Sequence, residues 1–140
     1  MRLIGNILWL VLSGFWLAVS YAVAGLILCV TIIGIPFGIQ SFKLASYSFW
    51  PFGRVVIEDP KSGAGGCIGN VLWVVLAGWW LALGHLFTGF LLCLTIIGIP
   101  LGIANFKLVM LSLVPFGKDI VSADRVAERD VWMRGPEPIR

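Results

Sequence analysis

Residues 31–39 read Thr-Ile-Ile-Gly-Ile-Pro-Phe-Gly-Ile, and residues 95–103 read Thr-Ile-Ile-Gly-Ile-Pro-Leu-Gly-Ile. Each copy lies inside a long apolar run. A proline inside a membrane helix removes a backbone donor, and the glycines beside it loosen the local helix. Because lipid offers no hydrogen bonds, we expect protein groups or a watery cavity to surround each of these twin breaks.

The composition indicates a membrane protein. Hydrophobic residues make up 59% of the 140 residues and charged residues 12%, whereas globular averages are about 45–50% and about 25%. No charged residue occurs from Leu3 through Phe42 or from Cys67 through Phe106. Since a transmembrane helix needs about 20 apolar residues, each run is long enough for two crossings.

The two apolar runs belong to a tandem duplication. Aligned without a gap, residues 5–54 and 69–118 are identical at 28 of 50 positions. We therefore divide the chain into a first membrane repeat, a polar Gly-rich linker, a second membrane repeat and a charged tail, at residues 1–57, 58–68, 69–121 and 122–140. A short helix is expected in the tail, over residues 123–133.

Within each repeat the sequence predicts a helical hairpin. A first crossing runs from Leu3 to about Ser20, and a turn follows near residues 20–24, or 84–88 in the second repeat. The second crossing, over residues 23–42, carries the Gly/Pro break, and an interfacial helix follows over residues 44–52. The predicted fold is an all-α integral membrane protein of two tandem helical hairpins, with about four spans and Gly/Pro-broken second spans.

The cations predict the orientation of these spans. If each repeat is a hairpin, all ten lie on one side of the membrane, which by the positive-inside rule is the cytoplasmic side together with both termini. They are Arg2, Lys43, Arg54, Lys61, Lys107, Lys118, Arg125, Arg129, Arg134 and Arg140. An alternative is two long spans with interfacial or re-entrant segments, and a single crossing per repeat would weaken the charge bias.

The repeated motifs resemble those of the YccF family, the inner membrane component domain. In the first repeat they are Gly5-Asn6, Trp9 and Trp16, the run from Ile33 to Lys43, and Pro51-Phe52-Gly53. The resemblance covers two copies of the domain, over residues 1–121. It implies a multi-pass protein of the bacterial inner membrane and assigns no molecular activity.

No residue pattern predicts catalysis. All seven acidic residues lie in the linker or after Lys118, outside both apolar runs, so no carboxylate pair is available inside the bilayer. His85 has Tyr21 at its repeat position, and we expect it to be an interfacial histidine. We expect Cys29, Cys67 and Cys93 to be small buried hydrophobes, and we predict no metal, no cofactor and no nucleic-acid partner.

The sequence leaves two functions open. One is a non-enzymatic structural or accessory membrane component, which contacts lipids and assembles with itself or another membrane protein. The other is a small oligomeric ion channel or transporter with its path at the breaks. Its candidate path-lining residues are Thr31, Gly34, Pro36, Gly38, Thr95, Gly98, Pro100 and Gly102, whereas Lys43 and Lys107 are candidate lipid or gate contacts.

Overall fold

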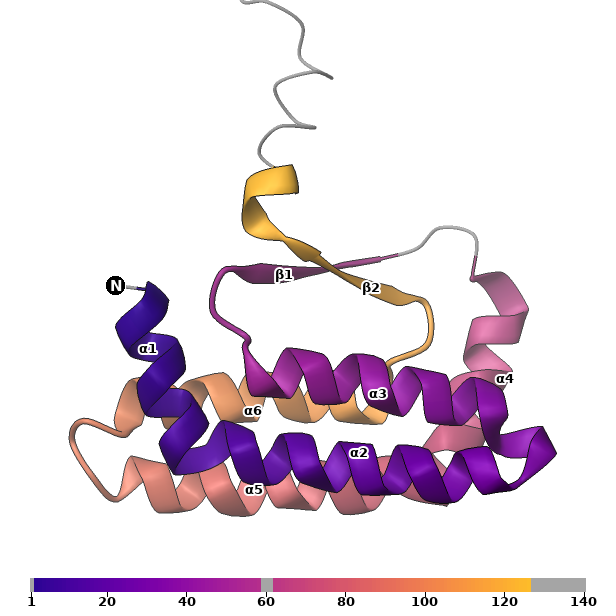
Figure 1. Cartoon of the computed structure of the whole chain (residues 1–140), viewed down its shortest axis with the longest axis horizontal. Helices are drawn as coiled ribbons and strands as arrows, with labels where there is room; N and C mark the ends of the chain where they lie inside the picture. The colour runs from indigo at the N-terminus through magenta and orange to yellow at the C-terminus, as the bar shows by residue number, and fades with distance from the viewer. Residues whose placement is uncertain (1, 59–61, 127–140) are drawn as a thin grey trace, which may run out of the picture.

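The structure is a computed structural model, and it describes residues 2–58 and 62–126. It is mostly helical and contains two copies of one arrangement (Figure 1). The first copy comprises α1 (Arg2–Trp9), a π-helical segment (Leu10–Gly14), α2 (Phe15–Val30), a 3-10 turn (Ile32–Gly34), α3 (Ile35–Phe49) and β1 (Arg54–Glu58). The second comprises α4 (Gly63–Trp73), a π-helical segment (Val74–Gly78), α5 (Trp79–Cys93), α6 (Ile99–Leu113) and β2 (Lys118–Ser122).

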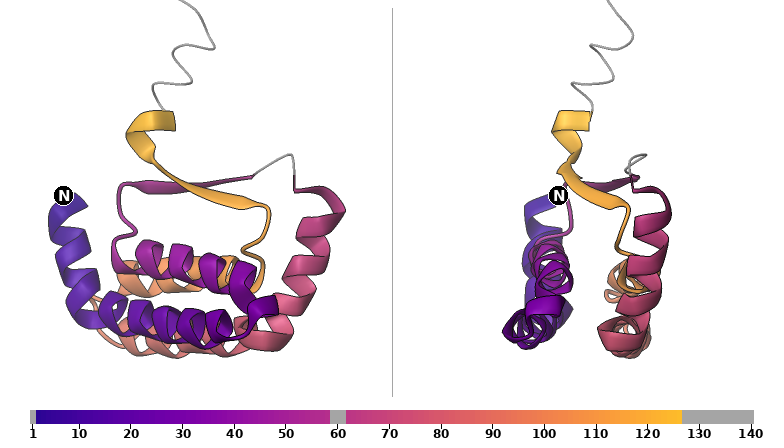
Figure 2. Two further views of the ribbon diagram at one scale, coloured as in Figure 1. Left: turned by 45° about the vertical axis from the view of Figure 1, so that its right-hand side comes forward. Right: turned by 90° about the vertical axis from the view of Figure 1, so that its right-hand side faces the viewer.

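Each repeat begins with a bent helix. The helical path is continuous over Arg2–Val30 and over Gly63–Cys93, and both are long and apolar enough to cross a membrane. Figures 1 and 2 show α1 and α4 standing steeply on the ends of α2 and α5. The bend coincides with the π-helical segment. A π-helical turn contains one residue more than an α-helical turn, and such π-bulges are a known cause of sharp kinks.

The chain reverses direction at the repeated motif. Helices α2 and α5 continue through residues 20–24 and 84–88, so the predicted turns there are wrong. Pro36 and Pro100 instead lie in the first turns of α3 and α6, where the missing N–H would have had no helical partner. The motif therefore starts a helix, and the predicted Gly/Pro break within a second span is not observed.

The helix that follows the motif is longer than predicted. Residues 44–49 continue α3 and do not form a separate interfacial helix. The helix ends just before Pro51, as its sequence predicted, and Gly53 turns the chain with a φ of +97°.

A two-stranded antiparallel sheet corrects the all-α prediction. Its register pairs Arg54 with Ser122 and Glu58 with Lys118. Both strands are short and rich in β-branched residues, and each obtains its ladder hydrogen bonds only from a partner far away in the sequence. The sheet therefore could not be recognised from either segment alone, and it joins the end of one repeat to the end of the other.

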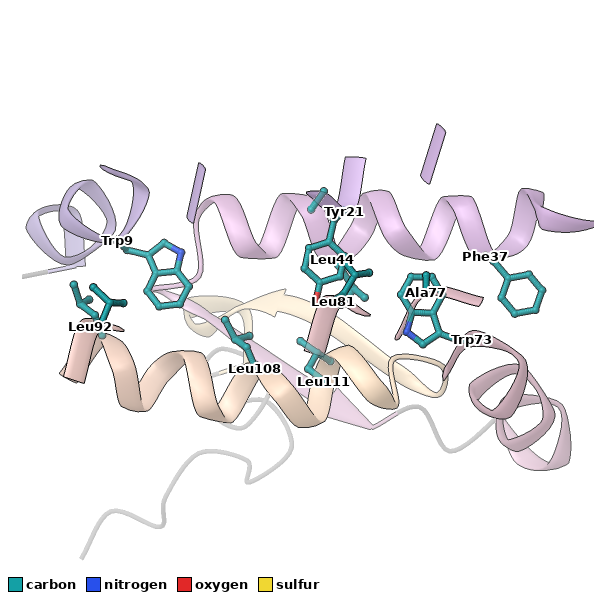
Figure 3. Packing of buried hydrophobic residues seen from close by; sticks show 12 residues of the cluster. Trp9, Tyr21, Phe37, Leu44, Trp73, Ala77, Leu81, Leu92, Leu108 and Leu111 are labelled. Atoms are coloured by element: carbon teal, nitrogen blue, oxygen red, sulfur yellow. The ribbon is translucent and has the colours of Figure 1, made fainter. Parts of the chain in front are cut away.

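The two repeats form adjacent helical layers beneath the sheet, as the right-hand view in Figure 2 shows. The strand register pairs the repeat mates Val56 and Ile120, and Tyr21 of α2 contacts its mate His85 of α5. The repeats are therefore related by an approximate two-fold axis that passes through the sheet and between α2 and α5. The buried core lies at this contact and contains Trp9, Tyr21, Trp73 and Leu81 (Figure 3). The predicted tail helix begins at residues 123–126, and its remainder lies outside the described residues.

Candidate functional site

The twin turns lie at opposite ends of the helical body (Figure 1). The turn after α2 is next to α4, and the turn after α5 is next to α1. In each, the threonine hydroxyl donates to a carbonyl three residues earlier, Thr31 to Leu28 at 2.8 Å and Thr95 to Leu92 at 3.0 Å. The structure therefore does not bring the two groups of candidate path-lining residues together.

The second glycine of each motif closes the hairpin. A Cβ added at Gly38 would collide with the Cys29 side chain and lie 2.8 Å from the Gly25 carbonyl oxygen. The mates Gly102, Cys93 and Gly89 repeat this arrangement. These positions pack one helix directly on the next. Cys29 and Cys93 are half-buried at this contact, whereas Cys67 is exposed, so the expectation of a buried side chain is wrong for Cys67.

Two polar anchors hold the corner of each repeat. Asn6 Nδ2 donates to the Phe52 carbonyl at 2.9 Å, and the Phe52 N–H donates to Asn6 Oδ1 at 2.9 Å. Trp9 Nε1 donates to the Ser48 carbonyl at 2.7 Å. The corresponding bonds of Asn70 with Phe116, at 3.0 and 2.8 Å, and of Trp73 with Ser112, at 2.6 Å, have similar lengths. The anchors attach the first helix to the Pro-Phe-Gly corner that ends the same repeat.

A polar network lies at the two-fold axis. Tyr21 Oη is 3.0 Å from His85 Nε2, although these residues occupy the same position in the two repeats. Tyr21 Oη is also 2.6 Å from Ser112 Oγ, and His85 Nδ1 is 3.0 Å from Asn105 Oδ1. Asn105 Nδ2 in turn donates to Ser13 Oγ at 3.1 Å. The network therefore connects α2, α5, α6 and the first π-helical segment.

The network is sealed from solvent. Its members are at most 1% exposed, and His85 is completely buried. The prediction of an interfacial histidine is therefore wrong, because the approximate symmetry points this position towards its own mate. Within residues 2–58 and 62–126, every buried side-chain nitrogen or oxygen has a hydrogen-bond partner.

Sequence comparison of the repeats contained only a weak signal for this network. At positions 21 and 85, and again at 41 and 105, both residues are polar or aromatic but differ in type. These differences do not stand out by themselves, because positions 19–24 and 83–88 differ throughout and positions 40 and 104 differ as well. Their role in the network is evident only in the structure, where the two repeats face each other across the two-fold axis.

The two candidate lysines have different surroundings. Lys43 Nζ lies 2.8 Å from Asp119 Oδ1, and this hydrogen bond, with one from the Ile120 N–H, lowers the pKa of Asp119. Lys107 instead lines a cavity of about 530 Å³ between the sheet and helices α3 and α6. Arg54 and Lys118 line the same cavity.

The described residues contain no group of three or more histidine, cysteine, aspartate or glutamate side chains that could hold a metal ion. Cys29, Cys67 and Cys93 are free thiols. The polar groups that the structure does gather are neutral ones at the axis and basic ones beneath the sheet.

Comparison with known proteins identifies the repeats. The profile of YccF, described as an inner membrane component domain, matches residues 4–54 and again residues 68–118. The chain is 36% identical over 133 residues to the inner membrane protein YccF of Escherichia coli K12, covering 89% of this chain and 90% of that protein. The YccF protein of Shigella flexneri matches with the same identity and coverage. No solved structure matches.

Proposed function

Because the chain belongs to the YccF inner membrane component family, we propose that it is a non-enzymatic structural component of the bacterial inner membrane. The observation that carries the proposal is the separation of charge from apolar surface. Helices α1, α2, α4 and α5 expose many large apolar side chains, whereas the basic residues gather around the sheet. An exposed apolar surface of this extent requires lipid or a protein partner.

The sheet and both ends of the chain are assigned to the cytoplasmic side. Strands β1 and β2 pair directly, and Arg2 Nη1 lies 3.2 Å from Asp124 Oδ1. These contacts hold α1, both strands and the start of the tail at one face of the molecule. Positive residues on one face agree with the positive-inside rule.

Each repeat is proposed to enter the bilayer from this side and return to it. From Arg2 to Gly14 the chain rises about 20 Å along the helix at about 1.5 Å per residue, which is short of a hydrocarbon core of about 30 Å. Helix α2 then lies across the direction of α1 (Figure 2). A re-entrant hairpin fits these lengths better than two complete crossings.

The hairpin tips support this placement. Ile32, Ile33, Ile96 and Ile97 are 85%, 87%, 88% and 74% exposed. At the end of a complete crossing, four exposed isoleucines would meet headgroups or water on the far side. Within the hydrocarbon, the same side chains are surrounded by lipid at no cost.

The closed interior favours a structural role over conduction through one chain. The axis is filled by hydrogen-bonded side chains, and large apolar ones such as Trp9 and Trp73 fill the interior on either side of it. A conducting path needs water or mobile ligands along its length, and this packing leaves the polar groups already partnered. Assembly with itself or with another membrane protein stays a prediction.

Labelling of single cysteines tests the proposed placement. In a chain carrying Cys29→Ala and Cys93→Ala, the exposed Cys67 near the sheet should react with a membrane-impermeant maleimide only from the cytoplasmic side. Ile32→Cys and Ile96→Cys, each introduced with Cys67→Ser, should react from neither side. Periplasmic reaction of either tip cysteine would establish complete crossings and overturn the re-entrant arrangement.

Reconstitution tests the structural role. Liposomes containing the purified full chain should pass ions and small solutes no faster than empty liposomes of the same lipid. Flux above that control, reduced by Thr31→Val or Thr95→Val and unchanged by Cys67→Ser, would overturn the proposal.

A further inference from the structure

The cavity beneath the sheet is basic and has apolar walls. Arg54, Lys107 and Lys118 contribute its charge, and Tyr47, Met110 and Leu111 are among its wall residues. Its volume of about 530 Å³ falls in the range of about 300–1,000 Å³ typical of small-ligand sites. No described acidic residue lines it.

The site that the two-fold axis relates to this cavity is filled by side chains of the protein. There the Gln40 amide donates to the Pro115 carbonyl at 2.9 Å, and Asp119 pairs with Lys43 at 2.8 Å. The repeat mates of Gln40 and Asp119 are Ala104 and Val55. On the cavity side, therefore, the amide that would fill the space and the carboxylate that would neutralise the lysine are both missing.

The basic groups keep donors for a ligand. In the described part of the chain no ion pair forms at Lys107 or Lys118, and Glu58, the strand partner of Lys118, does not line the cavity. Arg54 Nη1 donates to the Ser46 carbonyl and hydroxyl at 3.2 and 3.0 Å, so its other guanidinium nitrogens remain for an anion. Arginine and lysine together are well suited to phosphate oxygens.

We propose that this cavity binds the phosphate group of an anionic phospholipid from the cytoplasmic leaflet. The inference rests on the proposed membrane placement, which puts the cavity at the depth of the headgroups. Apolar wall residues such as Met110, which is 61% exposed, provide a surface for the start of the acyl chains. Free phosphate shares the chemistry of the headgroup but would use only the basic part of the cavity.

Lipid retention by the purified full chain tests the proposal. Protein in a neutral detergent is incubated with phosphatidylglycerol, with phosphatidylcholine or with inorganic phosphate, and bound ligand is measured by native mass spectrometry. Phosphatidylglycerol should bind at least about tenfold more tightly than phosphatidylcholine, which carries the same phosphate but adds a cationic choline that the basic cavity repels. It should also bind at least about tenfold more tightly than inorganic phosphate, which has no acyl chains to contact the apolar walls.

Variants that copy the occupied half give a sharper test. Val55→Asp should neutralise Lys107 and Ala104→Gln should fill the cavity, and each should weaken phosphatidylglycerol binding about tenfold. Lys107→Gln should have the same effect. Lys43→Gln is the matched control, and it should leave binding unchanged because Lys43 is paired with Asp119 on the other side.

Three results would overturn the proposal. They are equal retention of phosphatidylglycerol and phosphatidylcholine, equal losses in Lys43→Gln and Lys107→Gln, and inorganic phosphate binding as tightly as the lipid. An unchanged elution volume and unfolding midpoint would show that weakened binding in a variant does not come from misfolding. Cysteine labelling separates the two proposals. Lost lipid selectivity with unreactive hairpin tips overturns only the lipid site, and reactive tips with retained selectivity overturn only the re-entrant arrangement, because the cavity stays at the cytoplasmic headgroups in either arrangement.

Discussion

The two repeats agree at their corners and differ at the axis between them. The anchors of Asn6 and Trp9 recur at Asn70 and Trp73 with nearly the same bond lengths. Tyr21 and His85, by contrast, occupy one position of the repeat and contact each other. The corner residues are thus duplicated, whereas Tyr21 and His85, which meet between the repeats, differ.

The geometry of a two-fold axis explains this difference. Two identical chains must present the same group to each other at the axis, so every contact there has to be self-complementary. Fusion of both copies into one chain removes that requirement. Tyr21 can then supply a hydroxyl to a ring nitrogen of His85, and Asn105 can bond the other ring nitrogen while its mate Ser41 donates to the Tyr21 carbonyl.

The largest effect is expected from removing the corner tryptophans. Trp9→Ala and Trp73→Ala should each lower the free energy of unfolding by about 3–5 kcal/mol, because each removes a fully buried ring and its hydrogen bond. Denaturant titration in micelles, followed by far-UV circular dichroism, measures the loss. The exposed Trp16 and Trp80 provide controls, and their alanine variants should change stability by less than about 0.5 kcal/mol.

Equal losses at Trp9 and Trp73 would extend the agreement between the repeats from geometry to energy. If one variant unfolded and the other were nearly unaffected, the corners would be equivalent in shape only. The conclusion that the two corners stabilise their repeats equally would then fail.

The sequence alone predicted the duplication and the membrane class because both depend on composition and spacing. It misplaced the turns because apolar residues cover both helices so completely that no periodicity marks where one ends. Gly34 and Pro36 carried the missing information, since proline is as compatible with the first turn of a helix as it is disruptive within one. Their position in the chain cannot distinguish these two roles.

Features between the repeats were the ones that escaped prediction. The sheet needs Arg54–Glu58 and Lys118–Ser122 together, and the polar network needs α2 against α5. Both are contacts between residues about one repeat length apart. Of the candidate functional residues, Lys107 lines the basic cavity. Lys43 is neutralised by Asp119 of β2, whereas Lys107 shares its cavity with the apolar Val55 of β1, and neither strand residue is near its lysine in the sequence.

The next largest effect is expected at the axis itself. His85→Tyr would restore identical residues there, and it should cost about 1–3 kcal/mol because Asn105 loses its bond to the histidine ring. Tyr21→Phe should cost a similar or smaller amount. In a double-mutant cycle of Tyr21→Phe and His85→Leu, a coupling of about 0.5–3 kcal/mol is expected for side chains in direct contact.

Ser20→Ala is the control for this cycle, since its hydroxyl bonds only to the exposed Trp16 carbonyl of its own helix. It should show no coupling to His85. Additive effects of Tyr21→Phe and His85→Leu would contradict the network as an energetic unit and leave the axis as ordinary packing.

A smaller and symmetrical effect is expected at the asparagines. Asn6→Ala and Asn70→Ala each free one N–H and one carbonyl of the facing phenylalanine, and each should cost about 1–2 kcal/mol. Asn6→Asp keeps the acceptor but buries a carboxylate oxygen against the Phe52 carbonyl, so at neutral pH it should cost at least as much as Asn6→Ala. The unfolding midpoints of all three variants measure these differences, and unequal losses at Asn6 and Asn70 would weaken the equivalence of the corners.

The smallest effect is expected where one half has an ion pair and the other has none. Asp119→Asn removes the exposed partner of Lys43 and should cost at most about 1 kcal/mol at pH 7, with less at high salt. Because the folded-state pKa of Asp119 is lowered, its stabilisation is present above the unfolded-state pKa and is lost as the pH falls through the lower folded value. The midpoints of the wild type and Asp119→Asn should therefore differ at pH 7 and converge below about pH 4.

Val55, the mate of Asp119, has no charge to lose, so Val55→Asn should show no such convergence. A difference between the wild type and Asp119→Asn that stayed constant down to pH 3 would mean that Asp119 acts through packing, and the contrast between a neutralised and an open lysine would lose its electrostatic basis.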